Sequence, residues 1–568
     1  MNRNLSDWDD DLPPEPQEAY QDLLRALKRK SGFGLFFVQC TPEEADKFII
    51  KLPQEIPQKK IAVLRFVESI EKLYQPVAEF IKDKQVDILL IKGLEYSLYK
   101  YEKRSFSEIT ERQFRKLTSV PHILNHLNQQ RESFRDDFPI TFVFLVRSFS
   151  INYFIHRAPD FFDWRSGMFE LPITPEVVNK ESFRLLDETD YEEYFKISLE
   201  KKIVKMLDIQ DLLAEKHQTK SLKVSLLREL GRLLGSADEF EAAIASYDKA
   251  LKIKPDYYEA WYDRGNALRK LGRYKEALVS YDKALKIKPD YHEALNNRGY
   301  PLDKLGHYEE AIASYDKALT FKRDYYEAWY NRGYPLDNLG RYEEAIASYD
   351  KALTFKRDYH EAWNNRGYML VNLRRYEEAI VSYDKALEFK PDYLDVLNNR
   401  GYALDKLRRY EEALASYNKA LEFQPDYYNA WYNRGYPLHK LERYEEALAS
   451  YNKALEFQPD YYKIWYYRGI SLGKLGRYEQ AIASYDKALE FQPDYYNAWY
   501  NRGILLGKLG RYEQAINSFE QAVKNDPNFS KNRIIILFIC KILLIIVKFL
   551  HKLINSFKIL LKLIIWRR

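Results

Sequence analysis

The chain repeats itself every 34 residues between Val224 and Phe529, a span that holds nine consecutive repeats. One of them, residues 326–359, reads YEAWYNRGYPLDNLGRYEEAIASYDKALTFKRDY. With Tyr326 counted as position 1, every repeat has glycine at position 8 and alanine at positions 20 and 27. Position 4 is a large apolar residue, and position 24 is tyrosine or phenylalanine. Such regularity restricts the fold to a stack of similar supersecondary units, because one unit cannot bury its apolar face alone.

Two helices account for the spacing within a repeat. Positions 4, 8 and 11 share one helical face, and positions 17, 20, 24 and 27 share another. The small residues let two antiparallel helices approach closely. Pro301, Pro335 and Pro437 fall inside the first helix of their repeats and predict a kink there. Glycine at position 15 would end the first helix in five repeats, at Gly272, Gly306, Gly340, Gly476 and Gly510.

These residues resemble the tetratricopeptide repeat, with tyrosine usually standing in for the phenylalanine of that pattern. The resemblance implies an all-α, right-handed superhelix of helical hairpins over residues 224–529. It also implies that the first helix of each repeat lines a concave groove. Proteins of this kind are mostly adaptors that hold a peptide or a partner segment in the groove.

Tyrosine and asparagine dominate the positions that look into the groove in this family. Rigid tyrosine rings beside asparagine amides suit recognition of an extended or helical peptide, because tyrosine joins a broad apolar ring to a polar tip. The alternative is duplication of a tyrosine-rich repeat with no selected ligand. The groove candidates at positions 5, 6 and 9 are Tyr262, Asn297, Tyr330, Asn331, Tyr334, Asn365, Tyr368, Asn399, Tyr402, Tyr432, Asn433, Tyr436, Tyr466, Tyr500 and Asn501.

A lysine and arginine clamp for a C-terminal carboxylate, well known in this family, is not predicted here. Position 2 carries glutamate in four repeats: Glu259, Glu293, Glu327 and Glu361. Position 5 carries tyrosine or asparagine from the second repeat onward. Positions 2 and 5 therefore do not support such a clamp.

Residues 17–179 predict an α/β domain with a mostly parallel sheet. Short apolar runs at 34–40, 60–66, 86–91 and 140–146 alternate with amphipathic stretches, and continuous apolar strands are typical of a sheet covered on both faces. The acidic, proline-rich residues 1–16 before it are neither a signal peptide nor a transit peptide. Residues 180–223 are polar and helical in pattern, and predict a bridge to the repeats.

The element order of this domain resembles the core of AAA-type and related signal-transduction ATPases. The loop after the first strand, which begins at Gln39, has no glycine and no lysine-serine or lysine-threonine pair, so it lacks a Walker A motif. The third strand ends in Lys92-Gly93-Leu94-Glu95, without the paired carboxylates that hold magnesium. We therefore expect a degenerate P-loop relative that does not hydrolyse nucleotide, and assign no catalytic residue and no cofactor.

Metal and disulfide chemistry also find little support. His122 and His126 are four residues apart on a predicted helix, but no third ligand lies nearby, so a structural or surface role is favoured. Cys40 and Cys540 are too distant in sequence for a disulfide framework or a cysteine-based zinc site. The sequence therefore predicts a protein of a reducing compartment, where disulfides are rare.

The tail, residues 530–568, accounts for the net positive charge of the chain, +5. Residues 531–568 hold nine basic residues and no acidic one, so the chain total of 89 Lys+Arg and 84 Asp+Glu becomes 80 against 84 without them. A net charge of −4 argues against a nucleic-acid binder. The tail is a basic amphipathic helix with a wide apolar face, typical of an anionic membrane surface. Its membrane-contact candidates are Lys541, Lys548, Lys552, Lys558, Lys562 and Trp566.

Three alternatives for the tail remain open: a membrane-spanning helix, a cap on the solenoid, and read-through of AT-rich sequence. For the whole chain, the sequence predicts a non-enzymatic scaffold that is cytoplasmic and attached at the membrane through its tail. The arrangement resembles large bacterial repeat proteins. The alternative function is an ATPase-like signalling switch whose repeats are the sensor.

Overall fold

The computed structural model divides the chain into two compact units, Met1–Leu305 and Gly306–Arg568, which we call the N-terminal and C-terminal units and describe separately. The described residues are 16–67, 70–94, 97–98, 122–147, 150–151, 154–155, 158–171, 175–187, 191–215, 218–525, 542 and 545–546.

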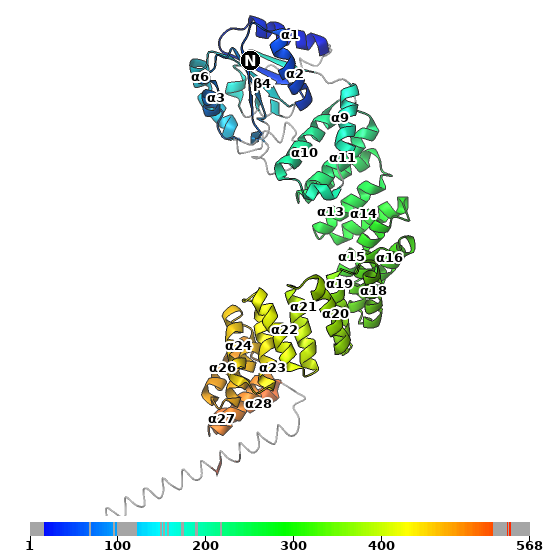
Figure 1. The fold of residues 1–568 in the computed structure, drawn as a ribbon, viewed down its shortest axis with the longest axis vertical. Coiled ribbons are helices and arrows are strands. Elements are labelled where there is room, and N and C mark those ends of the chain that lie inside the picture. The colour runs from blue at the N-terminus through cyan, green and yellow to red at the C-terminus, as the bar shows by residue number, and fades with distance from the viewer. Residues whose placement is uncertain are drawn as a thin grey trace, which may run out of the picture. The chain divides into compact units, whose positions relative to one another are not determined.

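The N-terminal unit opens with a five-stranded, all-parallel sheet in the order β2-β3-β4-β1-β5. Figure 1 shows this sheet, with its strand β4 labelled, among the helices α1, α2, α3 and α6. Every residue of β4 is buried, as expected for a strand that helices cover on both faces. The four strands predicted from the apolar runs are confirmed. The fifth escaped prediction because it has four residues and alternating exposure at the sheet edge. The strands are β1 (Gly34–Gln39), β2 (Ile61–Arg65), β3 (Ile88–Lys92), β4 (Thr141–Val146) and β5 (Gly167–Glu170).

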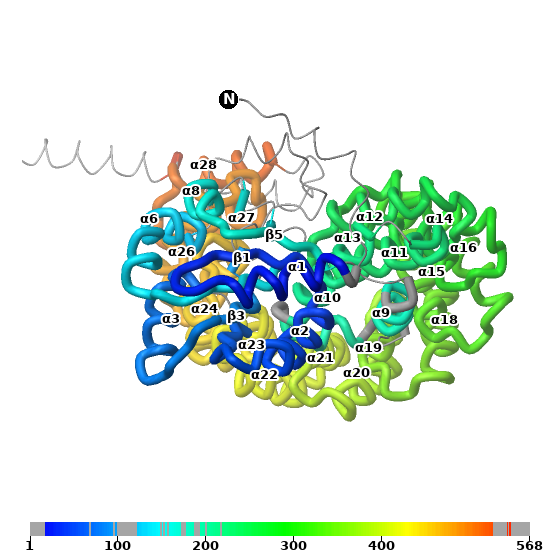
Figure 2. The backbone as a smooth tube through the Cα atoms, turned by 90° about the horizontal axis from the view of Figure 1, so that it is seen from above, coloured from blue at the N-terminus to red at the C-terminus, as the bar shows by residue number. Residues whose placement is uncertain are grey.

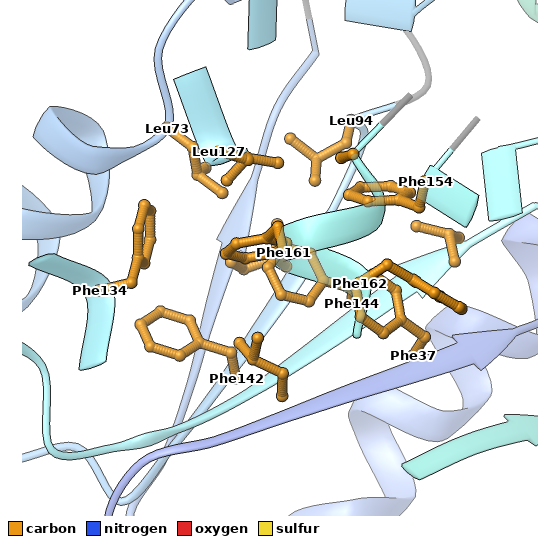
Figure 3. Close-up of a cluster of buried hydrophobic side chains, with 14 of the residues drawn as sticks. Phe37, Leu73, Leu94, Leu127, Phe134, Phe142, Phe144, Phe154, Phe161 and Phe162 are labelled. Carbon is orange, nitrogen blue, oxygen red and sulfur yellow. The ribbon is translucent and has the colours of Figure 1, made fainter. Parts of the chain in front are cut away.

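Helices cover both faces of the sheet. Leu24 of α1 and Phe48 of α2 belong to the hydrophobic core on one face, whereas Val77 of α3 and Leu127 of α6 belong to the core on the other. The second core is rich in phenylalanine (Figure 3), and the ring centroids of Phe37 and Phe162 are 4.9 Å apart. The helices are α1 (Pro16–Arg29), α2 (Pro42–Glu55), α3 (Tyr74–Ile81), α6 (His122–Asp137) and α8 (Pro159–Phe162).

A helical bridge leads from the sheet to the repeats. It consists of α9 (Pro175–Asp187), η2 (Tyr191–Phe195) and α10 (Leu199–Ala214). Tyr194 of η2 is fully buried, and its hydroxyl donates to the Glu229 carboxylate of the first repeat. The bridge is therefore packed against the repeats.

Each repeat folds into a first and a second helix, and consecutive helices pack against each other within each unit. Figure 2 shows the helices of the C-terminal unit following a curved path from α16 to α28. The tetratricopeptide solenoid is thereby confirmed. The N-terminal unit holds α11 (Lys220–Ser236), α12 (Phe240–Ile253), α13 (Tyr258–Lys270), α14 (Tyr274–Ile287) and α15 (His292–Lys304). The C-terminal unit holds α16 (Tyr308–Phe321), α17 (Tyr326–Asn338), α18 (Tyr342–Phe355), α19 (His360–Asn372), α20 (Tyr376–Phe389), α21 (Leu394–Lys406), α22 (Tyr410–Phe423), α23 (Tyr428–Lys440), α24 (Tyr444–Phe457), α25 (Tyr462–Lys474), α26 (Tyr478–Phe491), α27 (Tyr496–Lys508) and α28 (Tyr512–Asn525).

The proline-containing first helices are continuous. The helices α15, α17 and α23 run through Pro301, Pro335 and Pro437 and have the same 13-residue length as the proline-free α19 and α21. Proline therefore does not end these helices. A bend at each proline stays a prediction.

An arginine at position 7 ties neighbouring repeats together. In the last repeat, Arg502 donates from Nε to Asp486 of the preceding repeat (2.6 Å) and from Nη1 to Ser518 of its own second helix (2.6 Å). Equivalent pairs recur in earlier repeats, for example Arg366 with Asp350 and Ser382. One side chain thus fixes three helices.

Four repeats end their first helix without glycine. Asp238, Arg374, Arg408 and Glu442 hold position 15 with φ between 59° and 61°, the conformation that glycine adopts at this position in the other repeats. A left-handed conformation costs a side-chain-bearing residue roughly 1–2 kcal/mol. We predict that Arg408→Gly stabilises its repeat by about 1 kcal/mol, and that Gly476→Ala destabilises its repeat by a similar amount. Hydrogen exchange of α21 and α25 amides measures both, and equal changes in the two variants would contradict the prediction.

Candidate functional site

A cavity of about 360 Å³ lies at the carboxyl end of β1 in the N-terminal unit. Connections leave β1 and its neighbour β4 in opposite directions, toward β2 and β5, so this is the switch point at which open α/β sheets bind ligands. The cavity is lined by Thr41, Pro42, Glu43, Asp46, Glu181, Arg184, Leu185, Asp208, Asp211 and Leu212. Three helices thus contribute its walls: α2, α9 and α10.

Acidic residues surround the start of α2, where a phosphate-binding helix needs free backbone N–H groups. Thr41 caps the helix by accepting from the Glu44 backbone N–H at 3.3 Å, and Glu43 and Glu44 fill the first turn. Lys92 ends β3, ion-pairs with Asp46 at 2.9 Å and donates to the Pro42 carbonyl at 3.1 Å. The local charges oppose binding of an anion at this helix.

Arg147 contacts two of the acidic residues that line the cavity. It follows β4, is 4% exposed, and pairs with Asp208 (2.7 Å) and Asp211 (2.9 Å) of α10. The bridge helix α10 is thereby bound against the carboxyl end of β4. The ion pairs of Arg147 with α10 therefore occupy part of the switch point, where open α/β sheets otherwise bind a ligand.

Burial raises the pKa of Glu44 to about 7, although the backbone at Thr41 acts in the opposite direction. The folded state therefore holds this proton over a pH range in which the unfolded state, with an ordinary glutamate pKa, releases it. The contribution of Glu44 to stability is present below about pH 4.5 and is lost as the pH rises to about 7.

We predict that Glu44→Gln makes the unfolding free energy of the N-terminal unit less dependent on pH, with a relative gain at about pH 8 over about pH 5. Glu43→Gln is the matched control, because a hydrogen bond from Lys47 lowers the pKa of Glu43. Its substitution should leave the difference between the two pH values nearly unchanged, because a carboxyl with a lowered pKa is ionised in the folded state and largely ionised in the unfolded state across this range. Denaturant unfolding at both pH values measures the two effects, and a relative gain of equal size in both variants would contradict the assignment.

The predicted groove residues separate into two groups. Asparagines at position 6 bond to position 5 of the preceding repeat: Asn365 donates to the Tyr330 hydroxyl (3.2 Å), and Asn433 donates to Asn398 (2.9 Å). Position-5 tyrosines are half-buried, and burial raises the pKa of Tyr262 to about 12. Half-buried candidates are Tyr262, Asn297, Tyr330, Asn331, Asn365, Asn399, Tyr432, Asn433, Tyr466, Tyr500 and Asn501.

The second group is exposed. Position-9 tyrosines occupy four consecutive first helices of the C-terminal unit, and each exposes 38–48% of its surface. Tyr334 is partly tied, because its hydroxyl bonds to Tyr330 (2.5 Å) and accepts from Asn365 (3.3 Å). We call this group the tyrosine row. It consists of Tyr334, Tyr368, Tyr402 and Tyr436.

Other predicted sites lie elsewhere or outside the described residues. Within the part of the chain that the structure describes, no group of three or more His, Cys, Asp or Glu side chains could hold a metal ion, and no helix is long and apolar enough to cross a membrane. His126 is half-buried, and burial lowers its pKa. Glu95, Cys540 and the tail candidates Lys541, Lys548, Lys552, Lys558, Lys562 and Trp566 lie outside the described residues.

Comparison with known families agrees with the repeat array that the sequence predicts. Two family models described as tetratricopeptide repeat match residues 258–291, 360–393, 394–427 and 496–529, and residues 416–449. A third, described as TPR repeat, matches residues 231–272, 303–334, 338–373, 435–476 and 471–510. Among curated proteins no relative matches the chain.

Solved structures also match parts of the chain. YrrB, described as a TPR protein with an unusual peptide-binding site, is 28% identical; the match covers 30% of this chain and 89% of YrrB, with a TM-score of 0.28. MamA is 25% identical, and the match covers 28% of this chain and 95% of MamA, with a TM-score of 0.28. A tetratricopeptide repeat protein from Parabacteroides merdae is 21% identical, with coverage of 44% and 98% and a TM-score of 0.34.

Proposed function

The chain belongs to the tetratricopeptide repeat family through residues 231–529, and on that premise we propose that it is a non-enzymatic scaffold that binds a segment of a partner protein along its first helices. The tyrosine row carries the proposal. Its rings expose apolar surface in four consecutive repeats, whereas the tyrosines at position 24 are buried in the core. Exposed tyrosine offers contact area at a low cost in side-chain entropy, which makes it a frequent anchor in protein interfaces.

A capture experiment with matched variants tests this function. The full chain, the triple variant Tyr368→Ala, Tyr402→Ala, Tyr436→Ala and the triple variant Phe355→Ala, Phe389→Ala, Phe423→Ala serve as bait in extracts of the source cells. The phenylalanines are a control of comparable exposure (42–48%) on second helices. We expect partners identified by mass spectrometry to be lost from the tyrosine variant and kept by the phenylalanine variant. Equal capture by both variants would overturn the proposal.

The tail supports a second element of the proposal, attachment to an anionic membrane surface. The nine basic residues, together with the wide apolar face that the sequence predicts for a tail helix, favour such a surface over water. Flotation of the full chain with vesicles that contain anionic lipid is the test. Deletion of residues 531–568 is expected to abolish flotation, and flotation of the truncated chain to the same extent would overturn this part.

The cavity at the switch point favours one alternative, an ATPase-like switch in which the repeats are the sensor. The acidic start of α2 and the Lys92–Asp46 ion pair argue against nucleotide as the ligand. Titration of the full chain with ATP and magnesium distinguishes the two functions. The scaffold proposal expects no saturable binding, and saturable binding that Lys92→Ala changes would favour the switch.

A further inference from the structure

The first helices of the C-terminal unit change their charge along the array. Position 2, at the start of the first helix, is Glu327 and Glu361 in the early repeats, but Asn429, Lys463 and Asn497 in the last three. Position 13, in the last turn of the same helix, changes from asparagine to lysine after two repeats. The lysine row consists of Lys406, Lys440, Lys474 and Lys508.

All four lysines of the row are exposed, and among the described residues none of them forms an ion pair. Lysines on the second helices differ, because Lys453 pairs with Glu456 and Lys487 with Glu490, each within 2.8 Å. Asn338 and Asn372 hold the same position in earlier repeats, so the helix end itself does not require a cation. Three of these lysines lie over tyrosine rings, but among the described residues no carboxylate pairs with any of the four.

The lysine row and the tyrosine row overlap in two repeats. Lys406 lies 4.7 Å from the ring centroid of Tyr402, and Lys440 lies 5.2 Å from that of Tyr436, one helical turn apart on the same face. The first helices α21, α23, α25 and α27 contact one another in sequence, which brings successive lysines onto neighbouring helices. Burial lowers the pKa of His439. The positive charges of Lys474 and Lys440, which come from two different repeats, lower it further.

Of two carboxylates near the lysine row, one is buried and the other accepts a hydrogen bond from a tyrosine. Asp405 is buried, and burial raises its pKa to about 6 despite Lys406 and Lys440. Asp395 accepts a hydrogen bond from Tyr427 at 2.8 Å. The outward charge of this face is therefore positive, with aromatic rings beside it.

We propose that the lysine row binds an acidic segment of a partner protein, a proposal that names the partner's chemistry and rests on the proposed scaffold function. One cation per repeat matches carboxylates spaced along an extended chain, and the adjacent tyrosines cover its apolar parts. A protein segment is favoured over nucleic acid, because the chain outside residues 531–568 carries 80 basic against 84 acidic residues, a balance that opposes a continuous phosphate backbone.

Fluorescence anisotropy with the full chain tests the proposal. The probes are a labelled peptide in which glutamate alternates with glycine, the same peptide with glutamine for glutamate, and single-stranded DNA of matched length. The test variant is Lys406→Gln, Lys440→Gln, Lys474→Gln, Lys508→Gln. The control variant removes the same charge from second helices: Lys385→Gln, Lys419→Gln, Lys453→Gln, Lys487→Gln.

We expect the glutamate peptide to bind the full chain, with affinity reduced about tenfold or more in the test variant and changed less than about twofold in the control. The glutamine peptide should bind at least about tenfold more weakly. Absence of glutamate-peptide binding, equal binding by both variants, or tighter binding of the DNA would each overturn the inference. If the peptide fails while capture through the tyrosine row persists, the partner's chemistry is wrong and the scaffold function stands.

Discussion

Replacement of Arg147 by methionine is expected to lower the unfolding free energy of the N-terminal unit by about 3–5 kcal/mol. Methionine keeps an unbranched, apolar stem, although it is shorter than arginine, and leaves the carboxylates of Asp208 and Asp211 partly buried without their cation. Loss of one partner from a buried ion pair costs more than the pair contributes, because the remaining charge stays desolvated. Hydrogen exchange of the β4 amides in the full chain reports this change without requiring two-state unfolding of all repeats.

Two further variants make the Arg147 prediction specific. Arg184→Met breaks an exposed pair with Glu181 and is expected to cost no more than about 1 kcal/mol. The triple variant Arg147→Met, Asp208→Asn, Asp211→Asn should recover most of the loss, because it leaves no unpaired charge. Equal effects of Arg147→Met and Arg184→Met would contradict the assigned role of Arg147 as the link between the sheet and the bridge.

Gly401→Ala is expected to destabilise its repeat by about 2–3 kcal/mol, although alanine usually stabilises a helix interior by about 1 kcal/mol. A Cβ at this position would lie 2.6 Å from Cε1 of the buried Tyr417 ring, so the two helices of the repeat would have to separate. Exchange of the α21 and α22 amides measures the effect.

Gly473→Ala is the matched control within the same array. Its Cβ would meet nothing closer than the Leu505 side chain at 3.7 Å, an ordinary contact. We expect this variant to be stabilised by about 0.5–1 kcal/mol. Destabilisation of both variants to the same extent would contradict the packing account of position 8.

The repeats could be predicted in detail because their determinants are local and recur nine times. Gly401 and Tyr417 occupy positions 8 and 24, which carry glycine and an aromatic residue in every repeat. Each repeat therefore supported the same prediction of close helix packing. The tie made by Arg502 was missed, because it connects residues of different repeats whose spacing has no meaning until the helices are stacked. Position 15 showed that glycine is dispensable: Arg408 adopts the same positive φ, since tertiary packing outweighs its backbone preference.

The sites were harder to predict than the fold. Asn365 and Asn433 were expected in the groove, and the structure places their amides in bonds between repeats, whereas Tyr368 is exposed. The cavity at β1 is lined by residues of α2 together with Asp208 and Asp211, which lie far along the chain. In the sequence, these two aspartates look like part of the polar face of an ordinary helix. No motif or regular spacing in the sequence predicts that α2 and α10 line the same cavity.

Site-specific cross-linking tests the scaffold account most directly. A photoreactive phenylalanine analogue is placed at Tyr368 on the first helix of one repeat, or at Val381 on the second helix of the same repeat, where the exposed fraction is 59%. The account predicts that a partner protein cross-links from position 368 and not from position 381, in cells that produce the full chain. Cross-linking of the same partner from both positions, or from position 381 alone, would contradict binding along the first helices.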